Sequence, residues 1–259
     1  MSAIEEQQLE RRGRADAPVY VYGIVRAGAG VPRVPGVLGS SVAVVPERQV
    51  AALVSVVADE RVRAKRRDLL AHSDVLQEAH GGGVVLPLRF GTLFPSEEEL
   101  RAGFLGPRHD ELRSLLDRFE GLGEMRLRAS YHDEQSVLGE IVAEDQQVAR
   151  LREATRTGAA SHAQLVRLGE LVAARLEARR AADGDEIVRR LSEGAVDVNV
   201  DAPEGDLGVV KASFLVREQD RRRFDELLEA TALRLRHLVD FTCTGPLPPH
   251  SFVAIAGGR

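Results

Sequence analysis

The chain has 259 residues, of which 44% are apolar and 29% charged, with a formal net charge of −5 and a single cysteine, Cys243. One cysteine excludes an intrachain disulfide and is typical of a reducing compartment. An acidic balance with 4% aromatic residues and no tryptophan argues against nucleic-acid binding, which needs basic surface and stacking side chains. No run approaches the roughly 20 apolar residues of a membrane span.

Residues 1–17 are polar and charged and lack the apolar core of a secretory signal. We therefore expect a disordered N-terminal tail and a cytoplasmic protein without a membrane segment.

Residues 18–132 predict an N-terminal α+β domain with the element order strands, helix, strand, helix, strand. Buried strands are expected at 19–25, 42–45 and 53–57, with a helical turn at 47–52, and a half-buried strand at 124–132. A helix at 64–80 ends at three glycines, and Ser96 with Glu99 has the form of a capping box for a second helix. Between them, 84–94 reads as a strand broken at Pro87 or Gly91, and Pro87 indicates an edge position or a bulge. This order is compatible with a ferredoxin-like sheet carrying both helices on one face.

Residues 133–259 predict a second domain that opens with a helical segment, 133–193. Three helices are expected there, the second ending near 182–185. A hairpin of 196–200 with 208–216, a helix to about 239, and strands at 241–244 and 252–255 follow. The expected fold class is α+β, with two ferredoxin-like domains and additional helices in or beside the second.

Three short motifs resemble catalytic or cofactor signatures and fail on spacing. Gly28 and Gly30 follow a strand, but Arg33 stands where a dinucleotide fingerprint needs its third glycine. Gly81–Gly83 precedes a strand, not the helix that a phosphate cradle requires. The consecutive residues His72, Ser73 and Asp74 point about 100° apart on a helix and cannot form a triad among themselves.

Metal and cofactor sites are not indicated by the remaining pattern. The seven histidines contain no His-x-x-x-His pair, and Cys243 has no partner cysteine. We therefore expect no cofactor and no metal.

Two basic features and one proline-rich segment leave alternatives open. The run Arg61, Arg63, Lys65, Arg66, Arg67 is read as a solvated helix start, with docking to an acidic partner as the alternative. Arg89 interrupts an apolar strand, where it either reaches a buried carboxylate or carbonyl or extends from an edge. Residues 245–252 are predicted to be stiff and extended, as a rigid link or as a partner's ligand.

Four segments together resemble the gas vesicle protein F/L family. They are YVYGIV near the start, VVLPLRFGTLF, the VDVNV–GVVKASFLV hairpin and FTCTGPLPPHSFV near the end, in that order. The resemblance spans about Val19 to Val253, and one departure is His250, where the family usually carries an aromatic residue.

The resemblance implies two α+β domains, the first a modified ferredoxin-like fold, and no enzymatic activity. It implies contact with the small hydrophobic shell protein, gas vesicle protein A (GvpA), and with other accessory proteins, either in the cytoplasm or as a minor vesicle component. The candidate contact residues lie in the two most specific motifs: Pro87, Arg89, Phe90, Phe94, Pro246, Pro248, Pro249 and Phe252.

The residues themselves suggest how such contact works. A sheet edge near 87–94, or the face of the helices at 133–182, is a candidate surface for shielding an aggregation-prone shell subunit. The alternative reading is a small-molecule-binding regulatory protein with paired ferredoxin-like domains, which requires a concave apolar pocket.

Overall fold

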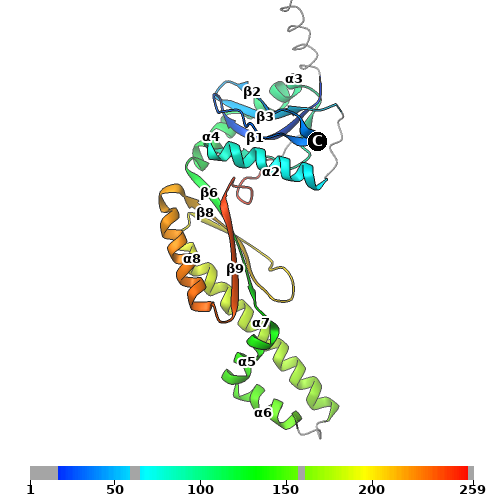
Figure 1. Ribbon diagram of the computed structural model, residues 1–259, viewed down its shortest axis with the longest axis vertical. Coiled ribbons are helices and arrows are strands. Elements are labelled where there is room, and N and C mark those ends of the chain that lie inside the picture. Colours follow the sequence, from blue (N-terminus) through cyan, green and yellow to red (C-terminus); the bar gives the residue numbers. More distant parts are fainter. Residues whose placement is uncertain (1–16, 59–64, 157–160, 256–259) are drawn as a thin grey trace, which may run out of the picture. The chain divides into compact units, whose positions relative to one another are not determined.

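The computed structural model describes residues 17–58, 65–156 and 161–255 (Figure 1). The chain divides into two compact units. Unit 1 comprises the chain up to Glu124 together with the stretch from Pro246 onward, and unit 2 is the continuous stretch Met125–Gly245. The sequence-based prediction places the domain boundary at residue 132 and assigns the last residues to the second domain. The predicted tail, apart from Ala17, lies outside the described residues, as do Arg61 and Arg63 of the basic run.

Unit 1 is built on an antiparallel sheet in which β1 is central. The strands are hydrogen-bonded in the order β2-β3-β1-β4, and β5 also pairs with β1. Residues 19–25 of β1 are buried throughout, as expected for a strand covered on both faces. The strands are β1 (Val19–Arg26), β2 (Ala43–Glu47), β3 (Val50–Val56), β4 (Val85–Pro87) and β5 (Leu93–Phe94).

Helices cover both faces of this sheet. From α2, Val75 and Leu76 pack with Tyr20 and Tyr22 on one face. In β5, Leu93 joins that same cluster, whereas the next residue, Phe94, points the other way and lies 5.4 Å from the ring of Phe104. The expectation that both helices share one face is therefore wrong for unit 1. The elements are η1 (Val37–Gly39), α2 (Arg66–Gly81), α3 (Glu97–Leu100), the π-helical turn η2 (Arg101–Leu105) and α4 (His109–Phe119).

Local turns explain where the strands of unit 1 end. The predicted helical turn at 47–52 is wrong, because β2 and β3 form a tight hairpin in which Arg48 takes a left-handed φ of 54°. The predicted break in 84–94 is confirmed: β4 stops at Pro87, and a turn follows in which Gly91 has φ 88°. Pro87 also lies at the edge of the sheet, as predicted, because β4 ends the strand order.

Unit 2 is built on a second antiparallel sheet with helices packed on one face. Its strands run in the order β7-β8-β6-β9. Met125 and Leu127 of β6 and Phe214 of β8 share a core with α7 and α8, whereas Arg126 and Arg128 on the other face of β6 are exposed. The strands are β6 (Leu122–Tyr131), β7 (Asp197–Asp201), β8 (Gly208–Arg217) and β9 (Val239–Leu247).

The helices of unit 2 form two groups (Figure 1). The long helix α7 and α8 cover the sheet, while α5 and α6 pack beside α7. Arg179 links α7 to α5 through ion pairs to Glu140 and Glu144, at 2.8 and 3.0 Å. It also pairs with Asp183 of its own helix at 2.9 Å. The helices are α5 (Glu134–Glu144), α6 (Gln146–Arg156), α7 (His162–Ser192), the 3-10 turn η3 (Glu218–Asp220) and α8 (Arg221–Leu235).

Two predicted element boundaries in the second half are wrong. The helix break at 182–185 is absent because Gly184 is buried inside α7, where a Cβ would stand 3.1 Å from the carbonyl of Val209. That glycine serves close packing of helix on strand, not helix termination. The strand expected at 252–255 is absent as well, because the backbone N–H groups of Phe252 and Val253 both donate to the Pro249 carbonyl.

The loop before β2 generates the first prediction. A Cβ on Gly36 would overlap the Tyr22 hydroxyl and lie 2.7 Å from Ser55 Oγ. The Tyr22 hydroxyl is hydrogen-bonded to Ser55 Oγ and accepts the N–H of Val37, both at 2.8 Å. We expect Gly36→Ala to lower the free energy of unfolding by about 2–4 kcal/mol, measured by urea denaturation.

Gly30 in the same loop provides the control. A Cβ there meets nothing within 4 Å, so Gly30→Ala should change stability by less than about 0.5 kcal/mol. Equal effects of the two substitutions would contradict this reading of the loop.

Candidate functional site

The first sequence motif, Leu86–Phe94, lies largely inside unit 1. Pro87 and Phe94 are buried, and Phe90 is half-buried with its ring 5.8 Å from Tyr20 and 5.7 Å from His72. Arg89 alone is exposed, and its carbonyl accepts two hydrogen bonds from Thr92, which fold the turn between β4 and β5. Within the described residues its guanidinium reaches no carboxylate, so the motif mainly builds this turn.

The second motif, Gly245–Phe252, belongs to unit 1 from Pro246 onward and contacts α2. Pro248 and Pro249 are buried, Phe252 is half-buried and Pro246 is exposed. The side chain of Gln77 donates to the Pro246 carbonyl at 2.9 Å. The expected extended form is correct only as far as β9 reaches, at Leu247, because the chain then turns at Pro249.

A buried carboxyl group anchors this turn. Glu124 is fully buried, and it accepts the backbone N–H of Ser251 at 2.7 Å and the Ser251 hydroxyl at 2.8 Å. A buried carboxyl group that loses a donor retains its desolvation cost without compensation. The end of the described chain is therefore fastened to the beginning of β6.

The Ser251 hydroxyl can be tested separately. Ser251→Ala removes one donor to the buried Glu124 and should lower the free energy of unfolding by about 1–2 kcal/mol in thermal or urea denaturation. In the matched variant Ser192→Ala, the lost hydroxyl donates to the Val188 carbonyl of its own helix, and we expect a decrease of less than about 0.5 kcal/mol. A larger effect at Ser192 than at Ser251 would refute the anchor.

A cluster of aromatic and imidazole side chains lies beneath the first motif. Tyr20 OH and His72 Nδ1 are 2.8 Å apart, and the N–H of Gly91 donates to the same hydroxyl at 3.1 Å. Burial lowers the pKa of His72 to about 4, with a further contribution from His250, and burial raises the pKa of Tyr20. Ser73 and Asp74 are exposed while His72 is buried, so the three form no triad. The His72 imidazole is therefore uncharged at neutral pH, and its hydrogen bond with Tyr20 links α2 to β1.

The low pKa of His72 predicts acid sensitivity. The folded state binds a proton at His72 only near pH 4, whereas the unfolded chain binds one near 6.5. Stability is therefore lost as pH falls through that window, by about 3 kcal/mol in total. The variant His72→Gln should show a smaller loss between pH 7 and 4.5 in urea denaturation. Parallel pH profiles for the two proteins would rule out this role.

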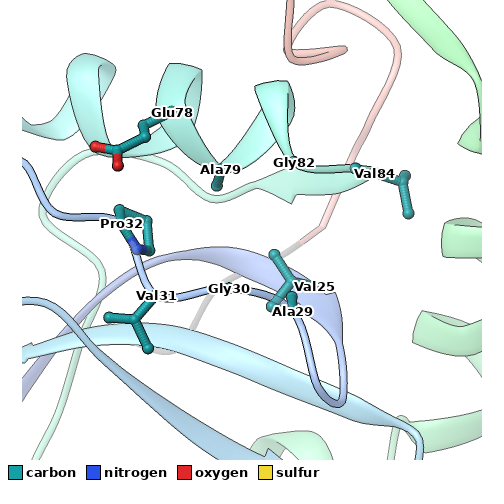
Figure 2. Close-up of a pocket in the computed structure, with 10 residues that line it drawn as sticks. Val25, Ala29, Gly30, Val31, Pro32, Glu78, Ala79, Gly82 and Val84 are labelled. Atoms are coloured by element: carbon teal, nitrogen blue, oxygen red, sulfur yellow. The ribbon is translucent and has the colours of Figure 1, made fainter.

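The glycine-containing loop after β1 forms a small pocket with the end of α2 (Figure 2). Its volume is about 150 Å³, and it is lined by Val25, residues 29–32, Glu78 and Ala79 of α2, and residues 82–84 after that helix. The carboxylate of Glu78 accepts the N–H groups of Arg33 and Val34, which holds its pKa below the usual range. A phosphate here would meet a carboxylate and the negative end of a helix, so this pocket is electrostatically unfavourable for a phosphate.

A larger apolar groove lies between helices of unit 2. It has a volume of about 600 Å³, and its polar lining residues are Gln135 and Arg152. The apolar lining comes from three helices: Leu138, Gly139 and Val142 of α5, Val148 of α6, and Leu168 and Val172 of α7. Figure 1 shows α5 and α6 beside the N-terminal half of α7, where the groove is formed.

The described part of the chain shows neither a cluster of metal-ligating side chains nor a helix suited to a membrane. Across residues 17–58, 65–156 and 161–255, no three His, Cys, Asp or Glu side chains come together as metal ligands. In the same residues, no helix combines the length and the apolar character needed to cross a bilayer.

The geometry defines the class: a two-unit α+β protein with two antiparallel sheets and an open apolar groove. The model of a family described as "Gas vesicle synthesis protein GvpL/GvpF" matches residues 18–254. Gas vesicle protein F of a Streptomyces species is 37% identical over 239 residues, which cover 90% of this chain and 98% of that protein. Gas vesicle protein L2 of Halobacterium salinarum is 25% identical over 266 residues, covering 95% and 94%.

Solved structures agree in fold. The crystal structure of GvpF from Anabaena sp. has a TM-score of 0.81 at 22% identity, covering 93% of this chain and 99% of that one. GvpF from Microcystis aeruginosa has a TM-score of 0.74 at 21% identity, covering 92% and 100%. The chain belongs to the GvpL/GvpF family, and its role is in gas vesicles.

Sequence reasoning selected the helical face at 133–182 but not the residues that shape its groove. Gly139 and Arg152 give no periodic signal, because one has no side chain and the other resembles the exposed arginines around it. The spacing of Leu168 and Val172 was the available sign.

Proposed function

We propose that this protein is an accessory or minor structural protein of gas vesicle assembly, located in the cytoplasm and on the vesicle. It binds the hydrophobic shell protein GvpA and other accessory proteins, and it performs no catalysis. The observation that carries the proposal is the apolar groove of α5, α6 and α7 in a chain of this family. Apolar grooves between helices are suited to holding a partner's amphipathic helix.

The groove has the composition that shielding of an apolar partner requires. Leu138, Val142, Leu168 and Val172 pack against the core of unit 2 yet remain partly exposed to the groove. Covering such surface stabilises a complex by roughly 25 cal/mol per Å² of apolar area removed from water. An aggregation-prone shell subunit gains the same protection on its own apolar face.

The sheet edge at Pro87–Phe94 is the second candidate contact surface, and it is the weaker one. Pro87 cannot donate a backbone hydrogen bond to an added strand, and Pro87 and Phe94 are buried. Of the residues selected from the motifs, Arg89 and Pro246 are exposed and Phe90 and Phe252 are half-buried. We propose these four as the ones accessible to a partner, with Pro248 and Pro249 supporting them from inside.

A ferredoxin-like fold of both units is part of the proposal. In unit 2 the elements follow the order β6, α5–α7, β7, β8, α8, β9, and the strands lie in the order β7-β8-β6-β9. This is the split βαβ arrangement. Unit 1 has the same relative strand order, β2-β3-β1-β4, with a loop and η1 in place of the first helix. The strand order supports the assignment.

The pocket of unit 1 is too small for the small-molecule-binding alternative. It has about 150 Å³, below the roughly 300 Å³ at which ligand sites begin. Its one carboxylate is already occupied by two backbone N–H groups.

Gly139 provides a direct test of the groove. It lines the groove, and a Cβ there meets nothing within 4 Å. Gly139→Arg therefore places a charge in the groove without removing a core contact. We expect roughly tenfold less GvpA to be retained when the tagged variant and GvpA are co-expressed and co-purified, because the buried charge has no partner.

Gly169→Arg on α7 is the matched control. Gly169 is exposed and equally open at its Cβ, and it is not part of the groove lining. This variant should retain GvpA like the original protein. If the original protein retains no GvpA although GvpA is present in the lysate, direct shell binding is wrong. If both arginine variants bind equally well, the groove is not the contact surface.

A further inference from the structure

The edge strand β7 carries an unusual distribution of side chains. Among the described residues it pairs only with β8, so one side of its backbone faces away from the sheet. Val196, just before it, is 44% exposed and Val200 is 56% exposed. Asp197, Asn199 and Asp201 alternate with the valines along residues 196–201 and are all exposed.

The register of β7 shows which face of the sheet its valines occupy and which face its aspartates occupy. Val198 lies opposite Phe214 and Val200 opposite Ala212, and both partners belong to the apolar core. The valine row therefore continues the core face of the sheet past the point where helices cover it. The aspartates lie on the other face, and Asp201 is opposite Lys211.

The acidic row is not neutralised by its own sheet. The Lys211 ammonium lies 2.6 Å from Glu204, so it is paired away from Asp201. One carboxylate oxygen of Asp197 accepts the N–H of Val198 at 2.9 Å, which leaves the negative charge in place. An approaching strand therefore meets exposed valines on one face and two negative charges on the other.

These charges decide which strand is accepted. A second copy of β7 pairing antiparallel about Asn199 would place Asp197 opposite Asp201 twice, and in-register parallel pairing would also stack aspartates. Like charges directly opposite each other are destabilising, whereas opposite charges stabilise a cross-strand pair. Charged edge residues are a common means of preventing self-association, so the second copy is disfavoured and a basic strand is favoured.

We propose that the β7 edge is a strand-addition site for a protein segment that alternates apolar and basic residues. The sheet already contains one strand of this kind, since Arg126 and Arg128 of β6 alternate with Met125, Leu127 and Ala129. An added strand of the same pattern continues the apolar face over Val198 and Val200 and places its cations beside Asp197 and Asp201. The site is separate from the α5–α7 groove and independent of GvpA binding there.

The test uses the full chain and two labelled synthetic peptides of seven residues. In one, valine alternates with arginine, and in the other glutamate replaces each arginine. Fluorescence anisotropy at low salt should give at least about fivefold tighter binding of the arginine peptide, because two cross-strand pairs change sign. Amide hydrogen exchange should show new protection in residues 196–201 on addition of that peptide.

The variant Asp197→Asn with Asp201→Asn is the matched control. Asn retains an oxygen that can accept the Val198 N–H, so the strand should fold as before, which thermal unfolding verifies. Its preference for the arginine peptide should fall below about twofold. Gly139→Arg should leave peptide binding unchanged, which separates this site from the groove.

Three results would overturn the proposal. They are equal binding of the two peptides, a preference that persists in the asparagine variant, and protection that appears elsewhere than in β7. Absence of binding by either peptide at millimolar concentration would overturn it as well.

Discussion

Strand β1 is buried on both faces, so the hydroxyls of Tyr20 and Tyr22 must find their hydrogen bonds inside unit 1. That constraint organises the elements around the strand. Tyr22 binds Ser55 of β3 and the N–H of Val37, which fixes the loop between β1 and β2. Tyr20 binds His72 of α2 and the N–H of Gly91, which fixes a helix and the turn of the first motif.

The residues of the two motifs that carry the family resemblance therefore mainly make structural contacts within unit 1. The first places its turn against the β1 hydroxyl and its aromatic ring over His72, and the second fastens a buried carboxyl group through Ser251. Surfaces whose side chains are not engaged in such internal contacts are better suited to binding a partner. In unit 2 these are the helical groove, which is apolar, and the β7 edge, which selects by charge. Separate surfaces allow one chain to hold two partners at once.

Much of the fold was predictable from local pattern, and the errors have identifiable causes. Alternation and apolar runs located β1, β6 and the β7–β8 hairpin, and Gly81–Gly83 located the end of α2. The helix end predicted near Gly184 is wrong because this glycine is required by tertiary packing. It makes room for the Val209 carbonyl. The strand expected at 252–255 is absent because a short apolar run does not distinguish a strand from a partly buried turn. The groove emerges only when three helices are packed together, so sequence indicated its face but not its shape.

Unit 2 is inserted as one uninterrupted stretch into unit 1, whose last piece follows at Pro246. During synthesis, unit 2 has all of its residues while unit 1 still lacks the turn that satisfies Glu124. The hydrogen-bond partners of Tyr20 and Tyr22 all lie between Val37 and Gly91, so the β1 network has its residues before any of unit 2 is synthesised. Glu124 is different, because its donor Ser251 is added only after the whole of unit 2 has been made.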